Sequence, residues 1–370
     1  MSAIPSPAPE RPAVVLLNFG GPRTLEDVEP FLFEILRDPN TIQLPVPQWL
    51  QDALARRIAR RRSRVVAAQY DLIGGGSPIV AATDAIARAL AAALERAGEP
   101  LPVYCAHRYL PGHTAATAAE LVAAGVDDLL ALPLYPHFSY ATTGSSFQQL
   151  RQALRRAGYR GRLRVLRSYP DAPGYLDALA EKLQACLFRE RPNPAETVIL
   201  CSAHGLPASY VERGDPYRLE LYRTLEGMQR RFGEWRFVLS FQSRVGPAEW
   251  LKPYTDQIIP ELAAEGVRHL VFLPLSFVND HLETLYEIDH LYCEQARRQG
   301  MVPVRVNAIE EEPRFIEVLS DYALAWRKGQ AGFPVAELLP PDQSFARVGR
   351  WVWAAWAAAL FAVLLLALGR

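Results

Sequence analysis

The segment that decides the fold is AELVAAGVDDLLALPL at residues 119–134, because it occurs a second time as PELAAEGVRHLVFLPL at residues 260–275. The two copies agree at nine of sixteen positions. Each is typical of a helix end, a capping glycine, a short apolar strand and a proline at the strand's carboxyl end. A strand that is apolar throughout indicates a parallel sheet covered by helices on both faces. The repeat therefore predicts two similar α/β halves.

Two weaker pairs of segments occur in the same order along the chain. VVLLNFGGP at 14–22 is similar to VILCSAHGLP at 198–207, 184 residues later, and VYCAHRY at 103–109 is similar to VLSFQSR at 238–244, 135 residues later. The spacing shrinks by about fifty residues between the two pairs, so the first half carries an insertion between its first two strands. We predict an α/β fold of two similar Rossmann-like halves, each a parallel sheet flanked by helices.

These repeats and the local composition predict the organisation of the chain. We expect a disordered N-terminus over 1–12, a first half over 13–170 with its insertion at about 30–85, a second half over 171–328, a linker over 329–350 and one C-terminal helix over 351–369.

The C-terminal helix has the composition of a membrane span. Residues 351–369 read WVWAAWAAALFAVLLLALG, nineteen residues without a charge. A helix of that length spans roughly 28 Å, close to the thickness of a bilayer core. Arg347 and Arg350 flank the end that carries three tryptophans, which predicts a single-pass anchor with residues 1–350 in the cytoplasm. The alternatives are a buried C-terminal helix or a dimerisation segment.

The composition excludes several classes of protein. Forty basic residues balance forty acidic ones, so the formal net charge is zero, which argues against a dedicated nucleic-acid binder. Half of the residues are hydrophobic, enough to fill a core and exclude global disorder. Four widely separated cysteines without a CxxC pair indicate neither a disulfide framework nor a zinc site.

A histidine lies where an open α/β sheet binds its ligands, at the carboxyl end of a strand. His204, in SAHGLP at 202–207, directly follows an apolar strand. A neutral imidazole there can accept a proton or contact a soft metal near neutral pH. The alternative is a histidine that only hydrogen-bonds within its turn.

A second polar cluster, NDHLETLYE at 279–287, follows another strand of the same half. Glu283, Glu287, His290 and Glu294 recur at helical spacing, which predicts one acidic stripe. Such a stripe either hands a divalent cation along the helix or is simply a solvated face. No HExxH or paired HxH motif occurs, so a tightly held zinc ion is not indicated.

The insertion contains two further patterns. GGGSP at 74–78 suggests a phosphate loop, but it lacks the Gly-Lys-Ser/Thr ending, which makes nucleotide binding a weak interpretation. A run of basic residues forms either a solvated helix face or, in a membrane-tethered chain, a surface for anionic lipid headgroups. The run consists of Arg56, Arg57, Arg60, Arg61, Arg62 and Arg64.

Taken together, these segments resemble the ferrochelatase family, whose members insert ferrous iron into a porphyrin. SAHGLPASYVERGDPY at 202–217 is similar to the family signature. The other matching segments, in family order, are LLNFGGP (16–22), QYDLIGGGSPI (69–79), HRYLP (107–111), PLYPHFSYATTGSS (133–146), FQSRVGPAEWLKP (241–253) and FVNDHLETLYEIDHLY (277–292). The resemblance covers roughly residues 12–328 and implies a chelatase-type fold.

The resemblance also assigns roles to residues. His204 matches the active-site histidine that accepts pyrrole protons or contacts the metal, and Glu283 matches its acidic partner across the porphyrin. A metal path would use His281, Glu287 and His290. The porphyrin-binding residues would be Phe19, Ile73, Ser77, Arg108, Tyr109, Tyr135 and Ser146.

The implied reaction is insertion of Fe²⁺ into protoporphyrin IX to give protohaem and two protons, the last step of haem biosynthesis. LNFGGP is similar to the branch that uses protoporphyrin, whereas the branch that uses coproporphyrin III typically carries a tyrosine in place of Asn18 and Phe19. The insertion at about 30–85 would form an apolar lip that grips the porphyrin.

No permanently bound cofactor is expected. Family members with a [2Fe-2S] cluster carry cysteines near the C-terminus and one at the position of Tyr140, and neither feature occurs here. The resemblance and the apolar tail together predict an enzyme on the cytoplasmic face of the inner or plasma membrane. An upstream porphyrin-producing oxidase would be its partner.

Two other functions fit parts of the pattern. One is another class II chelatase, which inserts iron or cobalt into a different tetrapyrrole such as sirohydrochlorin. The other is a non-catalytic, membrane-tethered porphyrin or haem carrier. The presence of both His204 and Glu283 favours catalysis, because a carrier has no use for a proton acceptor beside an acidic metal guide.

Overall fold

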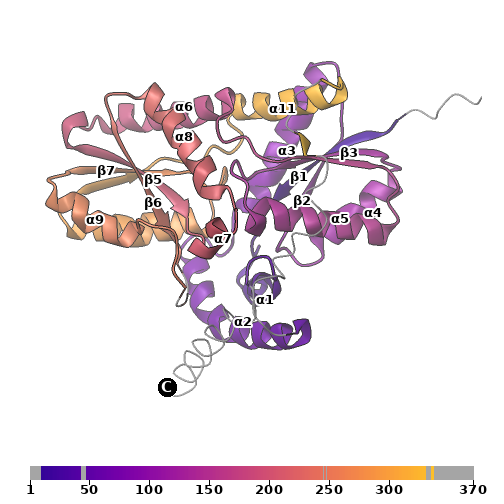
Figure 1. Ribbon diagram of the computed structural model, residues 1–370, viewed down its shortest axis with the longest axis horizontal. Helices are drawn as coiled ribbons and strands as arrows, with labels where there is room; N and C mark the ends of the chain where they lie inside the picture. The colour runs from indigo at the N-terminus through magenta and orange to yellow at the C-terminus, as the bar shows by residue number, and fades with distance from the viewer. Residues whose placement is uncertain (1–9, 43–46, 245, 247, 331–334, 337–370) are drawn as a thin grey trace, which may run out of the picture.

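The computed structural model describes residues 10–330, apart from 43–46, 245 and 247, together with 335–336. It contains two sheets whose four parallel strands have the same order, β2-β1-β3-β4 in the first and β6-β5-β7-β8 in the second (Figure 1). The short β9 (Val335–Ala336) extends the first sheet antiparallel to β4. The strands are β1 (Pro12–Asn18), β2 (Val103–His107), β3 (Asp128–Pro133), β4 (Arg162–Leu166), β5 (Thr197–His204), β6 (Arg236–Gln242), β7 (His269–Pro274) and β8 (Val302–Arg305).

Helices cover both faces of each sheet, as the apolar strands predicted. One face carries α3, α6, α8 and α11, and the other carries α4, α5 and α9 (Figure 1). The helices that flank the sheets are α3 (Ile79–Arg96), α4 (His113–Ala123), α5 (Ser145–Ala157), α6 (Pro173–Glu190), α7 (Ala208–Glu212), α8 (Tyr217–Arg231), α9 (Thr255–Ala264), α10 (Cys293–Arg298) and α11 (Pro313–Arg327). The prediction of two helix-flanked parallel sheets is confirmed.

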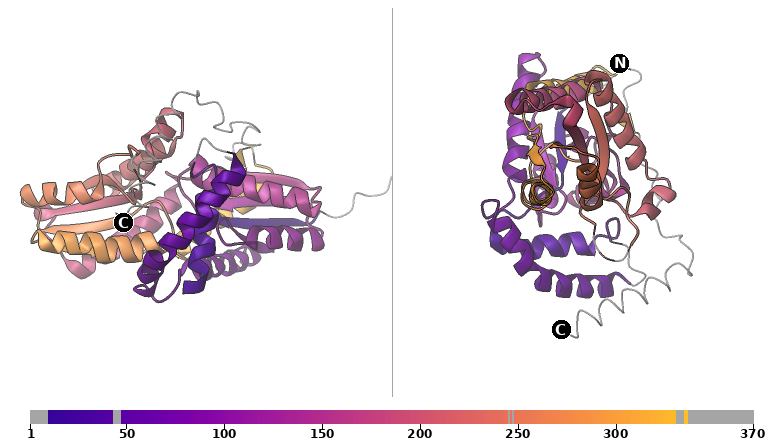
Figure 2. Two further views of the ribbon diagram at one scale, coloured as in Figure 1. Left: turned by 90° about the horizontal axis from the view of Figure 1, so that it is seen from below. Right: turned by 90° about the vertical axis from the view of Figure 1, so that its left-hand side faces the viewer.

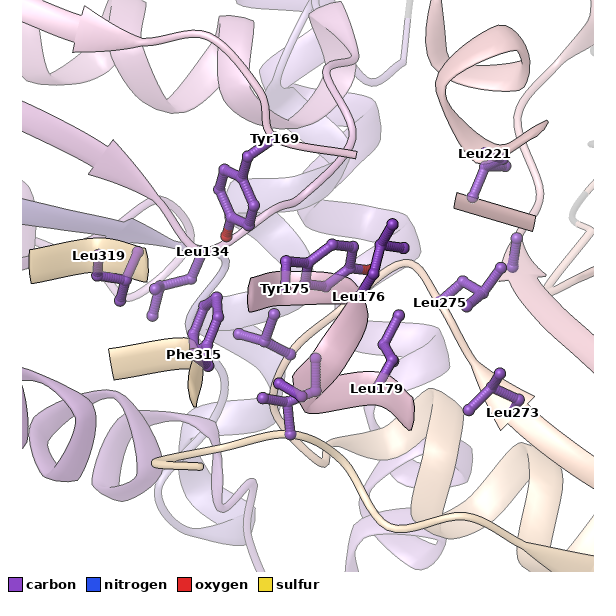
Figure 3. Close-up of a cluster of buried hydrophobic side chains, with 14 of the residues drawn as sticks. Leu134, Tyr169, Tyr175, Leu176, Leu179, Leu221, Leu273, Leu275, Phe315 and Leu319 are labelled. Atoms are coloured by element: carbon purple, nitrogen blue, oxygen red, sulfur yellow. The ribbon is translucent and has the colours of Figure 1, made fainter. Parts of the chain in front are cut away.

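One hydrophobic cluster runs through both halves on the face of α3, α6, α8 and α11 (Figure 3). Tyr169, Tyr175 and Phe315 lie at its centre and are almost fully buried. Helix α11, late in the chain, packs on α3 and α6 and so lies over the first sheet. The halves are therefore joined by a shared core layer.

Strand pairing corrects the register of the two weaker repeats by one residue. In the first half Val14 pairs with Leu130. Val271 corresponds to Leu130 in the second half, and it pairs with Ile199, not with Val198. Val14 and Ile199 also face the shared cluster, whereas Val198 faces the opposite side of its sheet. A shift of one residue turns every side chain to the other face of a strand. Similarity between two short apolar segments does not decide which of the two registers is correct. The corrected register places Phe19 and His204 at equivalent positions.

The same correction applies to the second strands of the two sheets. Val103 pairs with Val14 and Phe237 pairs with Ile199, so Val103 corresponds to Phe237 and not to Val238. The corrected spacing is one residue longer for the first pair of segments and one residue shorter for the second. The difference between the two spacings, which gives the length of the insertion, is therefore still about fifty residues.

The first half differs from the second by two extra helices, α1 (Val28–Arg37) and α2 (Gln48–Asp71). They pack against each other at one edge of the molecule, below the carboxyl end of β1 (Figures 1 and 2). Val28, Val66 and Tyr70 form a small cluster between them, which Leu282 of the second half also contacts. Helix α3, which follows, packs on β1 and β2 as the crossover helix between them.

Neither end of the chain adds a described membrane helix. None of the helices within the described ranges is both long and apolar enough to cross a bilayer. The predicted anchor over 351–369 lies outside the described residues. So do residues 1–9 of the predicted N-terminal lead-in and most of the predicted linker over 329–350.

Buried polar contacts join the loop after β3 to the second half. The Asp215 carboxylate accepts hydrogen bonds from the Ser139 hydroxyl and the Tyr140 amide, each at 2.9 Å. The Glu220 carboxylate accepts one from the Phe138 amide at 2.6 Å. Burial raises the pKa of both carboxyl groups. Since an unpaired buried carboxylate is costly, these bonds fix where the loop lies.

His137 belongs to the same loop and is also buried between the halves. Its Nε2 lies 2.8 Å from the Thr224 hydroxyl, and only 1% of the residue is exposed. Burial lowers the pKa of His137 to about 3. The imidazole is therefore neutral in the folded protein at any pH at which the protein is handled.

We expect Phe315→Ala to lower the free energy of unfolding by about 3–5 kcal/mol, because it leaves a cavity in the shared cluster. Phe188→Ala is the matched control, since Phe188 is 74% exposed, and it should change stability by no more than about 0.5 kcal/mol. Urea unfolding followed by circular dichroism measures both. Equal effects from the two variants would contradict the placement of the core.

We expect the stability conferred by a neutral His137 to be lost as the pH falls below 6.5. The unfolded chain binds a proton near pH 6.5 and the folded chain does not until about pH 3, so acid favours unfolding. The loss reaches up to about 1.4 kcal/mol per pH unit. Urea midpoints between pH 7.5 and 4.5 should therefore fall more steeply for the wild type than for His137→Gln. Parallel curves would show that His137 is not buried as a neutral ring.

Candidate active site

His204 ends β5 and is held by three hydrogen bonds. Its amide donates to the Ser276 hydroxyl at 2.7 Å, and its carbonyl accepts from the Tyr217 hydroxyl at 3.0 Å. Nδ1 lies 2.6 Å from the Gly205 carbonyl oxygen, which can only accept, so Nδ1 carries the proton. Nε2 is therefore left with a free lone pair, and a third of the side chain is exposed.

The turn after His204 requires glycine. A Cβ on Gly205 would lie 2.6 Å from the Gln242 carbonyl oxygen, closer than any real contact of this kind. The Gly205 amide donates to that same oxygen at 2.8 Å, which ties the end of β5 to the end of β6. This close approach of two backbones fixes the direction in which the His204 ring leaves the sheet.

Glu283 lies beside His204, at the start of the π-helix η4 (Glu283–Tyr292) that follows β7. Its Oε1 is 3.8 Å from His204 Nε2, and its Oε2 contacts Nε2 of the buried His281. The His281 Nδ1 lies 3.1 Å from the Asn279 carbonyl oxygen, which orients the ring toward Glu283. A carboxylate thus faces two imidazoles.

The charges of this group reinforce each other. Burial acts to raise the pKa of Glu283, but the charge and hydrogen bond of the neighbouring His281 outweigh it and hold that pKa well below its usual range. Burial likewise acts to lower the pKa of His281, and the Glu283 carboxylate raises it overall. Glu283 is therefore a carboxylate at neutral pH, and it lies next to His204.

His204 and Glu283 act from the same side of any flat ligand. The resemblance implied that they lie across a porphyrin from each other. An aromatic plane needs about 3.5 Å of van der Waals distance on each face, roughly 7 Å in all, and the two side chains are only 3.8 Å apart. A macrocycle therefore fits beside the pair and not between its members.

The predicted acidic stripe is divided, because residues 283–292 form a π-helix and not the α-helix that the spacing assumed. A π-helix bonds i to i+5, so its turns are wider: Glu283 and Glu287, four residues apart, still share a face, whereas His290, seven residues from Glu283, does not. Glu287 points inward and accepts a hydrogen bond from the Ser243 hydroxyl. His290 and Glu294 are exposed, and His290 stacks on Tyr286 at 5.9 Å.

Glu287 is the second carboxylate on the inner side. Burial and the charge of Glu283 raise its pKa to about 7. It can therefore bind or release a proton near neutral pH. Within the ranges that the structure describes, no three His, Cys, Asp or Glu side chains are arranged to hold a metal ion.

The first half contributes an amide and an aromatic wall. The Asn18 side chain donates to the Asn279 side-chain oxygen at 2.8 Å and to the Thr83 hydroxyl at 2.9 Å. The Phe19 ring lies 4.5 Å from Tyr109 and 6.1 Å from Phe277. The Phe277 ring in turn packs on His281 at 4.1 Å. Rings from both halves thus converge next to the His281–Glu283 pair.

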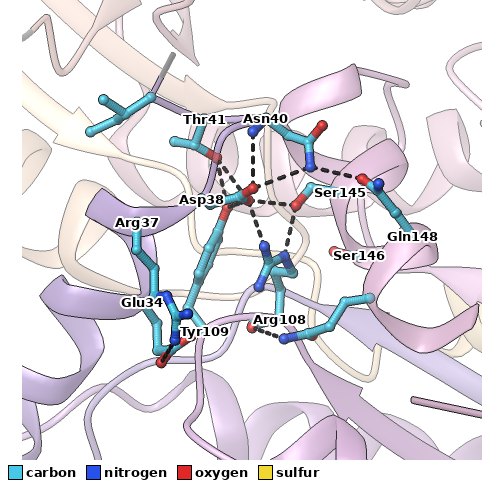
Figure 4. Close-up of polar contacts among 12 residues, drawn as sticks. Glu34, Arg37, Asp38, Asn40, Thr41, Arg108, Tyr109, Ser145, Ser146 and Gln148 are labelled. Atoms are coloured by element: carbon cyan, nitrogen blue, oxygen red, sulfur yellow. Dashed lines mark hydrogen bonds and ion pairs between the residues drawn. The ribbon is translucent and has the colours of Figure 1, made fainter. Parts of the chain in front are cut away.

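Arg108 and Tyr109 are bound to a residue that the sequence analysis missed. The buried Asp38, which follows α1, pairs with the Arg108 guanidinium at 2.7 Å and accepts a hydrogen bond from the Tyr109 hydroxyl at 2.8 Å (Figure 4). The Ser145 hydroxyl donates to the same carboxylate oxygen at 2.6 Å. Nothing in the sequence near Asp38 signals this role, because its partners lie 70 to 107 residues away in the chain.

The remaining predicted porphyrin residues lie near these groups in two places. Tyr135 is buried, and its hydroxyl is 3.4 Å from that of Ser146. The Ser77 amide donates to the Pro22 carbonyl at 2.7 Å, which joins the glycine-rich loop to the segment after β1. Ile73 packs in the small cluster of α1 and α2.

Comparison with known proteins agrees with this geometry. A sequence profile described as Ferrochelatase matches residues 11–325. A protein named Ferrochelatase from Synechococcus sp. (strain WH7803) is 42% identical over 354 residues, which cover 93% of this chain and 90% of that protein.

Two further relatives carry the same name. The protein from Synechocystis sp. (strain ATCC 27184 / PCC 6803 / Kazusa) is 43% identical over 323 residues, covering 85% of this chain and 82% of its own. The protein from Geotalea uraniireducens (strain Rf4) is 40% identical over 314 residues, covering 85% and 97%. Since the profile spans both sheets and these relatives match most of the chain, the chain belongs to the ferrochelatase family.

Proposed function

We propose that this chain inserts Fe²⁺ into protoporphyrin IX to give protohaem and two protons, the last step of haem biosynthesis. The observation that carries the proposal is the approach of His204 Nε2, with its free lone pair, to the Glu283 carboxylate at 3.8 Å. Fe²⁺ and the porphyrin are both substrates, and the chain's residues move protons and stabilise charge.

The two residues have complementary parts in the reaction. Metal insertion must remove two protons from the pyrrole nitrogens, and a neutral His204 can accept them at Nε2 one at a time, releasing the first before it takes the second. The ionised Glu283 stabilises the imidazolium that results and attracts the incoming cation. Glu287, with a pKa of about 7, is suited to pass protons onward to solvent. His281 holds Glu283 in place and is a positioning residue.

The aromatic wall supports the porphyrin part of the proposal. The macrocycle is a flat apolar disc, and the partly exposed Phe19 ring, backed by the buried rings of Tyr109 and Phe277, offers it an apolar surface. The extra helices α1 and α2 supply the apolar lip on one side of this wall. Binding energy from this contact can offset the distortion that exposes the pyrrole nitrogens.

Protoporphyrin IX is proposed over coproporphyrin III on the strength of Asn18 and Phe19. The Asn18 side chain is held by its hydrogen bond to Asn279 of the other half. Phe19, the next residue, adds an apolar ring that contacts Tyr109. A tyrosine, typical of the coproporphyrin branch, would add a polar group there. Protoporphyrin carries two charged propionates and coproporphyrin four, so an apolar wall favours the former.

Membrane attachment is part of the proposal and rests on the sequence. The uncharged segment 351–369 with flanking Arg347 and Arg350 supports a single-pass anchor with the two sheets on the cytoplasmic side of the membrane. An anchored enzyme can receive its apolar substrate from a membrane-associated, porphyrin-producing oxidase. We also propose that the enzyme works without a [2Fe-2S] cluster, because Tyr140 occupies the position of a cluster cysteine.

Metal insertion by the detergent-solubilised full chain tests this function. Fe²⁺ is offered anaerobically and Zn²⁺ in air, each with protoporphyrin IX and coproporphyrin III, and product is followed by its absorption spectrum. We expect faster metallation of protoporphyrin. Faster metallation of coproporphyrin would overturn the choice of porphyrin, and tight porphyrin binding without insertion of either metal would favour a carrier.

We expect His204→Ala to lower kcat for metal insertion by at least about 100-fold, the usual cost of losing a proton-transfer group. Porphyrin binding, measured by fluorescence quenching, should stay within a few-fold of the wild type because the aromatic wall is intact. His269→Ala is the matched control, since His269 begins β7 at the opposite end of the sheet. Turnover close to wild type in His204→Ala would show that another group accepts the protons.

A further inference from the structure

Asp38 makes an unusual number of bonds for one buried carboxylate. Its Oδ2 accepts from Arg108 at 2.7 Å, from Tyr109 at 2.8 Å and from Ser145 at 2.6 Å, and its side chain has no exposed surface (Figure 4). Its Oδ1 accepts from the Asn40 amide at 2.9 Å. The Asp38 carboxylate thus accepts several charge-assisted hydrogen bonds at once, and these bonds hold its partners in one geometry.

The segment around Asp38 is tied to both halves of the molecule. The Tyr210 hydroxyl, on α7 of the second half, donates to the Asn40 carbonyl oxygen at 2.9 Å. The Thr41 hydroxyl lies 2.7 Å from that of Tyr109, at the end of β2. Asp38 therefore lies where the lip helices, the first sheet and the second half meet.

Asp38 neutralises the positive charge of Arg108 beside the aromatic wall of Phe19, Tyr109 and Phe277. Its Nη2 is paired with Asp38 and its Nε donates to the Ser145 hydroxyl at 2.7 Å, and 11% of the side chain is exposed. The guanidinium stacks over the Tyr109 ring at 4.6 Å, and that ring contacts Phe19. The wall beside the site thus contains a cation that is already neutralised and held in place.

We infer that Asp38 is a specificity-determining positioning residue: by pairing with Arg108 next to Tyr109 and Phe19, it denies a free positive charge to the porphyrin. The inference rests on the proposed function. A wall without a free cation favours a porphyrin with two carboxylates over one with four, because each extra carboxylate must then lose water without gaining a partner. Arg108 accordingly supports the wall and does not serve as a ligand for the propionates.

The test compares kcat/KM and equilibrium binding for coproporphyrin III and protoporphyrin IX in the full chain. Asp38→Asn keeps the size of the side chain but releases the charge of Arg108. We expect the coproporphyrin-to-protoporphyrin ratio of kcat/KM to rise at least about threefold, the effect of one partly exposed ion pair. The double variant Asp38→Asn with Arg108→Gln removes both charges, and the ratio should return to the wild-type value.

Asp128→Asn is the matched control. Asp128 is a buried carboxylate paired with Arg162 at 3.0 Å, but it begins β3 at the opposite end of the sheet. This variant should leave the ratio unchanged even if it lowers stability. If Asp38→Asn does not fold, Ser145→Ala, which loosens Arg108 without changing charge, should shift the ratio in the same direction by a smaller factor.

Equal losses with both porphyrins in Asp38→Asn would overturn the inference, because they would reveal a purely structural role. A raised ratio that persists in the double variant would also overturn it, since Arg108 would not be the cause. Failure of the proposed function gives a different result, namely no insertion by the wild type. The dissociation constants of the two porphyrins then decide whether Asp38 controls the choice between them.

Discussion

The hydrogen bond between Asn18 and Asn279 joins the carboxyl ends of the two sheets, and the geometry of the site depends on it. These residues lie 261 positions apart in the chain, and both are about 1% exposed. Without Asn18 the buried side-chain oxygen of Asn279 would lose its partner, at a cost of about 1–3 kcal/mol. Asn279 also presents its backbone oxygen to His281, which in turn faces Glu283. A contact between the halves thus helps to orient the Glu283 carboxylate.

The electrostatics of the site follow from this placement. One carboxylate, Glu283, stays ionised because His281 faces it, whereas burial and the charge of Glu283 raise the pKa of Glu287, one π-helical turn away. Two groups of the same chemistry therefore have different protonation states at neutral pH. In the proposed reaction this separation lets Glu283 attract a cation while Glu287 exchanges protons.

The sequence predicted the sheets better than the site, and particular residues show why. The strands β3 and β7 were evident because every residue after the first is apolar in each of them, a purely local signal. The register of β1 against β5 was wrong by one residue, because only pairing with a neighbouring strand decides which face Val14 occupies. The π-helix at 283–292 and the role of Asp38 depend on contacts distant in sequence, so local spacing carried no signal for either.

The corrected register shows which side chains occupy equivalent positions in the two halves. Phe19 and His204 follow equivalent strands, each just before a glycine at the same turn, Gly20 and Gly205. A Cβ on Gly20 would lie 3.0 Å from His107, much as one on Gly205 would meet Gln242, so both turns need the close approach of a neighbouring strand. The same backbone position thus carries an apolar ring in one half and a proton acceptor in the other. In the proposed reaction a flat apolar substrate is bound and deprotonated, so two copies of one strand end supply both requirements only because their side chains differ.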